Sequence, residues 1–326
     1  MEKDRLTHDQ SYKWKSDTSV NSRVRKNKLL ECIFGSCINR LINWVVTARR
    51  KFPGQRILAS KIDYKSAYQR CHLSAETGIQ TCTQLADENL AIVALILTFG
   101  GALGSYKWGV ISESSCNLTI AILQDESWNP KSLCAPGLEL VPKKTILNDD
   151  VPFGVGKDLI VDVPVDPKGI ADVYIDDTIA LGVDLQNTNN SMRLENTILL
   201  VIHVAARPIH PEEPIPREEM AALEKLLAKA GLEETKMILG LFCGFIRMTV
   251  ALPTNKYVAW KSDILNMLKY RNATASKLDT IIGRLGNIGF IIHQIFHFLS
   301  RLRELFRRAK NRRSIRIDNT ISKDLK

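Results

Sequence analysis

The chain has 326 residues, of which 45% are hydrophobic and 25% charged. This composition is ordinary for a folded globular protein, and the length allows two or three subdomains. The net charge of +10 predicts a polyanionic partner, either nucleic acid or an acidic membrane surface.

Several classes of protein are excluded by what the sequence lacks. The longest apolar run, residues 90–99, is too short to span a membrane. The N-terminal residues have no apolar core of a signal peptide. The seven cysteines form no Cys-x-x-Cys pair, which fits reduced thiols. We therefore expect an intracellular protein of the cytoplasm or nucleus that is not secreted and has no membrane partner.

The first half of the chain alternates polar segments with short periodic ones. Residues 1–28 are polar and basic, which indicates an exposed arm or part of an incomplete subdomain. Helical spacing of apolar residues predicts one or two amphipathic helices over residues 29–51. Residues 56–63 predict a strand that ends at Asp63, and residues 88–99 predict an apolar helix before a glycine-rich break. A further helix is expected over about residues 114–123.

Two adjacent aspartates mark the centre of the chain. Apolar residues alternate with other types on both sides of Asp176 and Asp177, which predicts a tight hairpin with the two aspartates at its tip. Asp-Asp is a poor turn pair, and two neighbouring carboxylates disfavour each other's ionisation. Both costs are offset if the pair binds a cation. The alternative is an Asp-rich surface turn.

The second half of the chain is mostly helical. Residues 207–216 contain four prolines and are interpreted as a linker, followed by a helix that stops at Gly231. Residues 237–242 and 245–252 predict a pair of strands. Residues 256–270 and 276–309 predict two long helices, and residues 301–316 hold eight Lys or Arg against one Glu.

Three carboxylates stand at positions that suit metal chemistry: Asp63 at a strand end, and Asp176 and Asp177 in the hairpin. Carboxylates together with substrate phosphates are the usual ligands of Mg²⁺. Two such ions stabilise both the attacking and the leaving oxygen in phosphoryl displacement. We therefore expect two Mg²⁺ ions, with Mn²⁺ as a substitute. Asp63 has a second interpretation, as a helix N-cap.

Four motifs in order resemble those of the reverse transcriptases, the RNA-directed DNA polymerases of retroelements. They are the first palm motif at Lys61–Tyr68, the segment under the template and nucleotide at Leu97–Ala102, the Tyr-x-Asp-Asp hairpin at Tyr174–Asp177, and the primer-grip region at Lys236 with Leu239–Phe242. Residues 252–303 resemble the thumb, so the resemblance covers roughly residues 5–305.

The resemblance implies an α/β (α+β) right-hand polymerase with an antiparallel-sheet palm, partial fingers and a helical thumb. Residues 1–55 would form the partial fingers, and residues 56–252 the palm, with insertions at about 69–98 and 125–169. Residues 253–326 would form the helical thumb and the basic tail. The implied partners are an RNA or DNA template with a primer, and dNTPs. The oligomeric state is left open.

The resemblance also implies a role for individual residues. Asp63 and Asp176 would be the main metal ligands and Asp177 the third carboxylate. Tyr68 would be the steric gate against a ribose 2′-OH, the group that distinguishes RNA from DNA. The nucleotide pocket would further include Phe99, Gly100, Arg5 at the triphosphate, and Lys236 near the leaving pyrophosphate. For these positions the simpler interpretations are core packing for Tyr68, a solvated arm charge for Arg5 and a surface lysine for Lys236.

The sequence departs from the family at the fingers and at the glycine-rich segment. Thr98 replaces the usual proline, Leu103-Gly104 stands in place of Ala-Pro, and few residues precede Arg5. The motif order supports the first hypothesis, an active polymerase. An alternative is an inactive retroelement-derived remnant that binds nucleic acid without polymerising. A third hypothesis, an unrelated basic binding module, requires the motif order to be coincidental.

Overall fold

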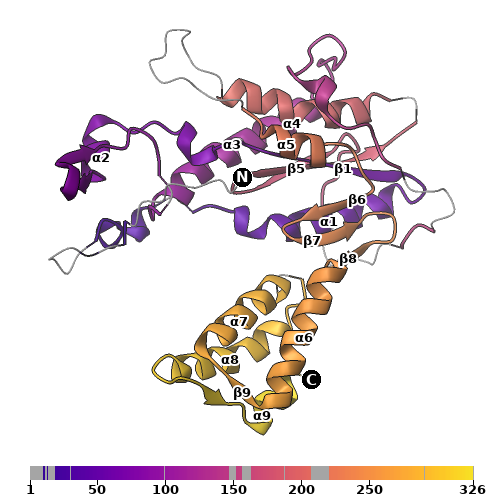
Figure 1. Ribbon diagram of the computed structural model, residues 1–326. Coiled ribbons are helices and arrows are strands. Elements are labelled where there is room, and N and C mark those ends of the chain that lie inside the picture. Colours follow the sequence, from indigo (N-terminus) through magenta and orange to yellow (C-terminus); the bar gives the residue numbers. More distant parts are fainter. Residues whose placement is uncertain are drawn as a thin grey trace. The chain divides into compact units, whose positions relative to one another are not determined.

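The computed structural model describes residues 10, 11, 13, 19–29, 31–98, 100–146, 152–155, 163–186, 188–206, 220–289 and 291–325. The chain divides into two compact units (Figure 1). Unit 1 comprises residues 1–236 and 244–249, and unit 2 comprises residues 237–243 and 250–326. The assignment of these parts to fingers, palm and thumb stays a prediction. The predicted proline-rich linker lies outside the described residues.

The centre of unit 1 is a sheet of three antiparallel strands in the order β1-β5-β4. The strands are β1 (Arg56–Asp63), β4 (Ile170–Tyr174) and β5 (Asp177–Asp184). The sequence predicted β1 with these bounds, and it predicted the β4–β5 hairpin. In the register of β1 and β5, Asp63 lies opposite Asp177 and Arg56 lies opposite Asp184. The sheet therefore has carboxylates at the end where β1 stops and β5 begins.

Helices cover both faces of this sheet. Figure 1 shows α3 (Gly104–Gln124) and α4 (Asn190–Ala206) on one face and α1 (Cys37–Lys51) on the other. Residues 57–63 of β1 are all buried, because neither face of the strand meets solvent. Helix α3 begins ten residues before the predicted helix of residues 114–123, so the helix that packs on the sheet is longer than predicted. The expected α/β fold with an antiparallel sheet is confirmed.

One predicted helix of unit 1 is wrong. Residues 88–99 do not form an apolar helix, because β3 (Leu90–Ile92) pairs with β2 (Thr83–Leu85) in a short hairpin. Leu90 and Ile92 are exposed there. A short apolar run fits a strand and a buried helix equally well, so its periodicity did not decide between them. The other helices of this unit are α2 (Ala75–Gln80), α5 (Leu223–Lys229), and the short 3₁₀ turns Asn21–Arg23, Lys26–Lys28, Phe34–Ser36, Ala67–Arg70, Ala86–Glu88 and Leu138–Leu140.

A second sheet of three strands has the order β6-β7-β8. Its strands are β6 (Thr235–Ile238), β7 (Leu241–Gly244) and β8 (Thr249–Ala251), where the sequence predicted a pair. Leu239 and Gly240 have positive φ angles of 49° and 79° between β6 and β7. Positive φ at both central residues is typical of a type I′ hairpin turn.

Unit 2 has its own apolar core, built mainly from α7 and α8. The predicted single helix of residues 276–309 is wrong, because the chain turns between α7 (Ala275–Gly289) and α8 (Ile295–Ala309). A Cβ atom on Gly289 would lie 2.9 Å from the Phe296 ring, so glycine allows this close approach. The remaining elements are α6 (Thr254–Tyr270), β9 (Asn272–Ala273), β10 (Ile315–Arg316) and α9 (Asn319–Asp324). Among the described residues, no helix combines the length and the apolarity needed to cross a membrane.

Candidate active site

The hairpin between β4 and β5 has a different tip from the predicted one. Its two turn residues are Ile175 and Asp176, and Asp177 is already the first residue of β5, paired with Tyr174. Ile175 has a φ angle of +58°, a strained conformation for a β-branched residue. The buried Trp108 indole donates a hydrogen bond of 2.7 Å to the Ile175 carbonyl. A side chain of helix α3 therefore stabilises the strained turn through this hydrogen bond.

The three predicted carboxylates meet at this end of the sheet. Asp63 and Asp177 are cross-strand partners in the β1–β5 register. The Tyr64 backbone N–H donates to the Asp176 carbonyl at 3.2 Å, so the chain after Asp63 is attached to the turn itself. Asp63 is almost fully buried, with a side chain that is 1% exposed. Two segments separated by more than a hundred residues thus place Asp63 beside the hairpin.

Two lysines balance these carboxylates. The Lys61 ammonium donates to Oδ2 of Asp177 at 2.5 Å and lies 3.9 Å from Oδ1 of Asp63. The Lys225 ammonium, from α5, lies 2.5 Å from Oδ2 of Asp63. Neither oxygen of Asp63 receives an aligned hydrogen bond among the described residues. Asp63 is therefore a buried carboxylate whose partners are charges rather than well-aligned donors.

Burial and these charges move the pKa values in opposite directions. Burial acts to raise the pKa of Asp63, but interaction with Asp177 and the ammonium groups of Lys225 and Lys61 bring it below its usual value. Burial and the neighbouring Asp63 raise the pKa of Asp177 to about 6. Burial also raises the pKa of Asp176. The site thus behaves as a carboxylate pair that holds one proton more readily than an isolated aspartate does.

The carboxylate oxygens at this end of the sheet meet some, but not all, of the requirements for binding a divalent cation. Both enclosed oxygens of Asp63, with Asp177 opposite, offer the hard carboxylate ligands that Mg²⁺ prefers. Within the described residues, however, no group of three or more His, Cys, Asp or Glu side chains is gathered closely enough to hold a metal ion. Asp176, expected as a main ligand, is near enough for its charge to interact with Asp63, but Asp177 is the direct neighbour of Asp63.

Tyr68, the predicted gate, lies between the hairpin and the glycine-rich segment. Its ring packs edge-on against Trp108 with centroids 6.4 Å apart. A Cβ atom on Gly104 would lie 3.8 Å from this ring, so α3 begins directly against Tyr68. Burial and the charge of Asp176 raise the pKa of Tyr68. The structure therefore brings Tyr68 to the carboxylates and to the start of α3.

The glycine-rich segment is held by side chains from the N-terminal part of the chain. The Asn21 amide donates to the Gly100 carbonyl at 2.8 Å and accepts from the Ala102 N–H at 2.6 Å. The Gln10 amide donates to the Thr98 hydroxyl at 2.9 Å. Thr98, which replaces the family's proline, is thus used as a hydrogen-bond acceptor. These contacts fix a loop that a proline would otherwise stiffen.

A basic pocket of about 660 Å³ lies beside this segment. Its lining includes Thr98 and Gly101, and among the described lining residues there is no Asp or Glu. The positively charged lining residues are Arg23, Arg25, Lys28 and Lys107. A concave, basic surface next to the glycine-rich segment is suited to a polyanion.

Of the other predicted site residues, Lys236 is described and is not brought to the carboxylates. Arg5 and Phe99 lie outside the described residues. Lys236 is 4% exposed, and its ammonium donates to the Gly231 carbonyl at 2.7 Å and pairs with Glu233 at 3.2 Å. Burial lowers its pKa. The ammonium group that reaches Asp63 from the later part of the chain is that of Lys225 instead.

The sequence interpretation missed Lys61, Lys225 and Trp108. Lys61 had a usable signal, because a residue two positions before Asp63 on a strand lies on the same face. Lys225 had none, since it lies on a helix far from Asp63 in the chain. Trp108 stood in a helix whose start was not predicted.

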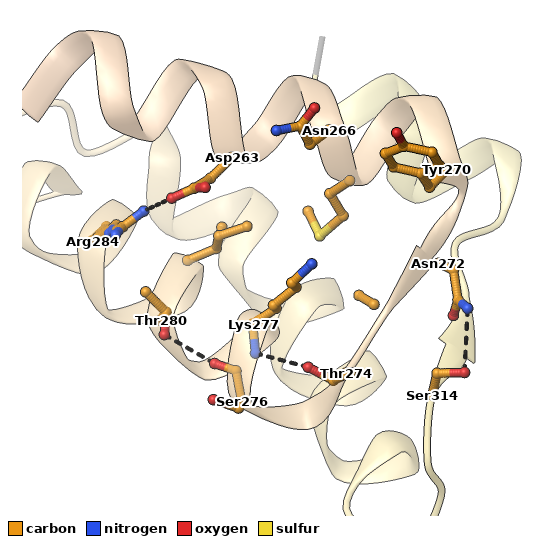
Figure 2. A pocket seen from close by; sticks show the side chains of 13 residues that line it. Asp263, Asn266, Tyr270, Asn272, Thr274, Ser276, Lys277, Thr280, Arg284 and Ser314 are labelled. Atoms are coloured by element: carbon orange, nitrogen blue, oxygen red, sulfur yellow. Dashed lines mark hydrogen bonds and ion pairs between the residues drawn. The ribbon is translucent and has the colours of Figure 1, made fainter.

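Unit 2 contains a separate pocket of about 350 Å³, lined by polar and apolar residues mainly of α6, α7 and the strand β9 between them. Figure 2 shows Lys277 at the start of α7, and Asn266 and Tyr270 on α6, around this pocket. Arg284 and Asp263 form an ion pair at one side. No residue predicted for the active site lines it.

Comparison with known proteins gives a match in structure only. No family model and no curated protein matches the sequence. The fold is similar to a foamy viral protease-reverse transcriptase solved in complex with double-stranded DNA, with a TM-score of 0.51 and 12% sequence identity. The alignment covers 94% of this chain and 38% of that one. A structure of the foamy viral protease-reverse transcriptase with an RNA/DNA hybrid has a TM-score of 0.45 and 13% identity, and covers 82% of this chain and 26% of that one. At these identities the similarity shows the fold.

Proposed function

We propose that this chain is a template-directed DNA polymerase of the reverse transcriptase type, which transfers nucleotides from dNTPs to the 3′-hydroxyl of a primer. The observation that carries the proposal is the pairing of Asp63, at the end of β1, with Asp177 in the Tyr-Ile-Asp-Asp hairpin. The similarity of fold to a reverse transcriptase supports it. The template is RNA or DNA, and the reaction takes place inside the cell, in the cytoplasm or the nucleus.

The carboxylates would hold the catalytic cations. Asp63 and Asp177 are the direct neighbours, and Asp176, whose charge interacts with Asp63, would be the third ligand. When bound, two Mg²⁺ ions would stabilise the attacking and the leaving oxygen of the displacement, and Mn²⁺ would substitute for them. Burial of Asp63 keeps its oxygens out of water, so that electrostatic interactions there are stronger than at a surface.

The remaining predicted residues would act on the nucleotide. Tyr68 would restrict the space at the ribose 2′ position, because Trp108 and the start of α3 hold its ring. Gly100 and Phe99 would form part of the pocket, and Arg5 would contact the triphosphate. A role for Lys236 at the leaving pyrophosphate would require its ammonium to leave Gly231 and Glu233.

Basic surfaces of both units would bind the nucleic acid. In unit 1 this is the pocket beside the glycine-rich segment. In unit 2, α8 and the residues after it expose a run of arginines, namely Arg303, Arg307, Arg308, Arg312 and Arg313. Contacts of this kind position a duplex through its phosphates without reading its sequence, which suits an enzyme that copies any template.

A primer-extension assay on poly-rA/oligo-dT with dTTP and Mg²⁺ tests the proposal. Wild-type protein should extend the primer, and Asp63→Asn should lose the activity by at least a hundredfold, because the amide loses the charge that holds the cation. Asp184→Asn is the matched control: it removes a carboxylate at the opposite end of β5, paired with Lys144, and should extend normally. Equal extension by wild type and Asp63→Asn contradicts the proposal.

A second function, nucleic-acid binding without polymerisation, is favoured by the two lysines that already balance the carboxylates. It predicts binding of an RNA/DNA hybrid that weakens steeply with salt and no incorporation of dTTP under any divalent cation. Filter binding at two salt concentrations, beside the extension assay, separates the two functions.

A further inference from the structure

The strongest unexplained feature of the molecule is the pair of lysines among the candidate catalytic carboxylates. Buried lysines are rare unless they are paired. Lys61 is 6% exposed and lies on β1, two residues before the end of the strand. Its ammonium contacts Asp177, which a polymerase would need for cation binding. A cation supplied by the chain therefore lies where the proposed function requires a bound ion.

The two lysines differ in their freedom to move. Lys61 is confined, since β1 is buried and pairs with β5 along its whole length. Lys225 lies on the seven-residue helix α5, and its side chain is 45% exposed. A lysine side chain has a long flexible stem, so its ammonium can leave Asp63 for water without any change of the backbone. Of the two ammonium groups, that of Lys225 is the one that can be displaced.

The charges at the site indicate what such a displacement does. Two ammonium groups offset two of the three carboxylate charges of Asp63, Asp176 and Asp177. Asp63 has both oxygens enclosed, and Lys225 is the nearest cation to one of them. Without Lys225, a buried carboxylate would be left with Lys61 at 3.9 Å as its nearest cation. Uncompensated buried charge is costly, so Lys225 stabilises the protein when no divalent cation is bound.

We propose that Lys225 is a displaceable internal counter-ion, which occupies Asp63 in competition with the divalent cation and leaves when the cation binds. Lys61 stays in place, hydrogen-bonded to Asp177. Lys225 thereby sets the concentration of divalent cation that the site requires. This inference rests on the proposed function, because it takes Asp63 to be a metal ligand.

The test is a titration of the full chain with Mn²⁺ alone, in which free Mn²⁺ is measured by electron paramagnetic resonance. Lys225→Met retains the length of the side chain and removes the competing charge. It should bind Mn²⁺ about tenfold more tightly than wild type, equal to about 1.4 kcal/mol. The control is Lys229→Met, one turn further along the same helix, which should bind Mn²⁺ as wild type does.

Thermal unfolding provides a second readout that does not depend on catalysis. In the presence of a chelator, Lys225→Met should unfold at a lower temperature than wild type, because Asp63 loses its nearest cation. At the same Mn²⁺ concentration, the unfolding temperature of the variant should rise more than that of wild type, because stabilisation by a ligand grows with the logarithm of its concentration relative to Kd.

The outcomes distinguish this inference from the proposed function. If wild type binds Mn²⁺ and Lys225→Met binds it equally or more weakly, Lys225 does not compete, and the inference is wrong while the proposed function stands. If neither protein binds Mn²⁺ even at millimolar concentration, both are wrong, since there is no cation for Lys225 to displace.

Discussion

Trp108→Phe tests whether α3 holds the hairpin that carries the carboxylates. The change removes the indole N–H that donates to the Ile175 carbonyl at 2.7 Å. Loss of the donor to this partly buried carbonyl costs about 1–3 kcal/mol, and the smaller ring leaves a cavity worth about 1 kcal/mol. The free energy of unfolding, measured with urea, should therefore fall by about 2–4 kcal/mol.

The same change should disturb the site itself. Ile175 has a φ angle of +58°, a strain of about 1–3 kcal/mol that persists only when surrounding contacts impose it. Without the indole donor the turn can relax, and the hydrogen bond from the Tyr64 N–H to the Asp176 carbonyl should open more often. We expect faster hydrogen exchange of the Tyr64 amide and at least tenfold slower primer extension.

Trp128→Phe is the matched control. Its indole also donates to a backbone carbonyl, that of Leu133, at 3.3 Å, and the residue is also buried, at 8% exposure against 1% for Trp108. This variant should lose about 1–2 kcal/mol of stability and leave the Tyr64 amide and primer extension unchanged. If the two variants lose stability alike and neither changes the Tyr64 amide, the reasoning about the hairpin is refuted.

Three further predictions follow from charged groups in unit 1. Arg40→Met removes the two hydrogen bonds of 2.6 and 2.7 Å that the guanidinium donates to the buried Asp172, so the free energy of unfolding in urea should fall by about 3 kcal/mol. The double variant with Asp172→Leu should regain part of this stability. A double variant that is less stable than Arg40→Met contradicts the argument. Arg193→Met removes four hydrogen bonds to carbonyls at and after the end of α3 and should cost about 3 kcal/mol, whereas the exposed Arg301→Met should cost less than about 1 kcal/mol. The pKa of Asp177 is raised to about 6 in the folded protein. Between about pH 4 and 6 the folded protein therefore keeps a proton on Asp177 that the unfolded chain releases. The free energy of unfolding should then fall as the pH rises, by at most about 1.4 kcal/mol per pH unit. Asp177→Asn should remove this slope in urea titrations with a chelator, and an unchanged slope would show that another group is responsible.

The sequence predicted the part of the site that depends on local pattern. Strand periodicity located β1 and its final residue Asp63, and the alternation around Tyr174 located the hairpin. The tip was misplaced by one residue, because the two aspartates suggested a turn made of both. In the structure the turn takes Ile175 at positive φ, which propensity rules disfavour and which contacts from Trp108 and Tyr64 hold in place.

What the sequence did not predict depends on contacts between distant segments. Lys225 meets Asp63 only because α5 lies beside β1, and its helix gives no sign of that partner. The hairpin at residues 83–92 was predicted in part as a helix, because a short apolar run lacks the polar positions that distinguish the two periodicities. Charge placement and strand pairing of this kind are tertiary effects.

At the glycine-rich segment, side-chain hydrogen bonds compensate for the lack of a proline before the glycines. A proline before the glycines restricts φ and so limits the freedom of the loop. Thr98 does not, but its hydroxyl accepts from Gln10, and Asn21 bonds the loop on both sides of Gly101. A Cβ atom on Gly101 would lie 2.7 Å from the Gln10 amide oxygen, so the Gln10 side chain packs directly against this glycine. These hydrogen bonds therefore fix the loop in the absence of the proline restraint.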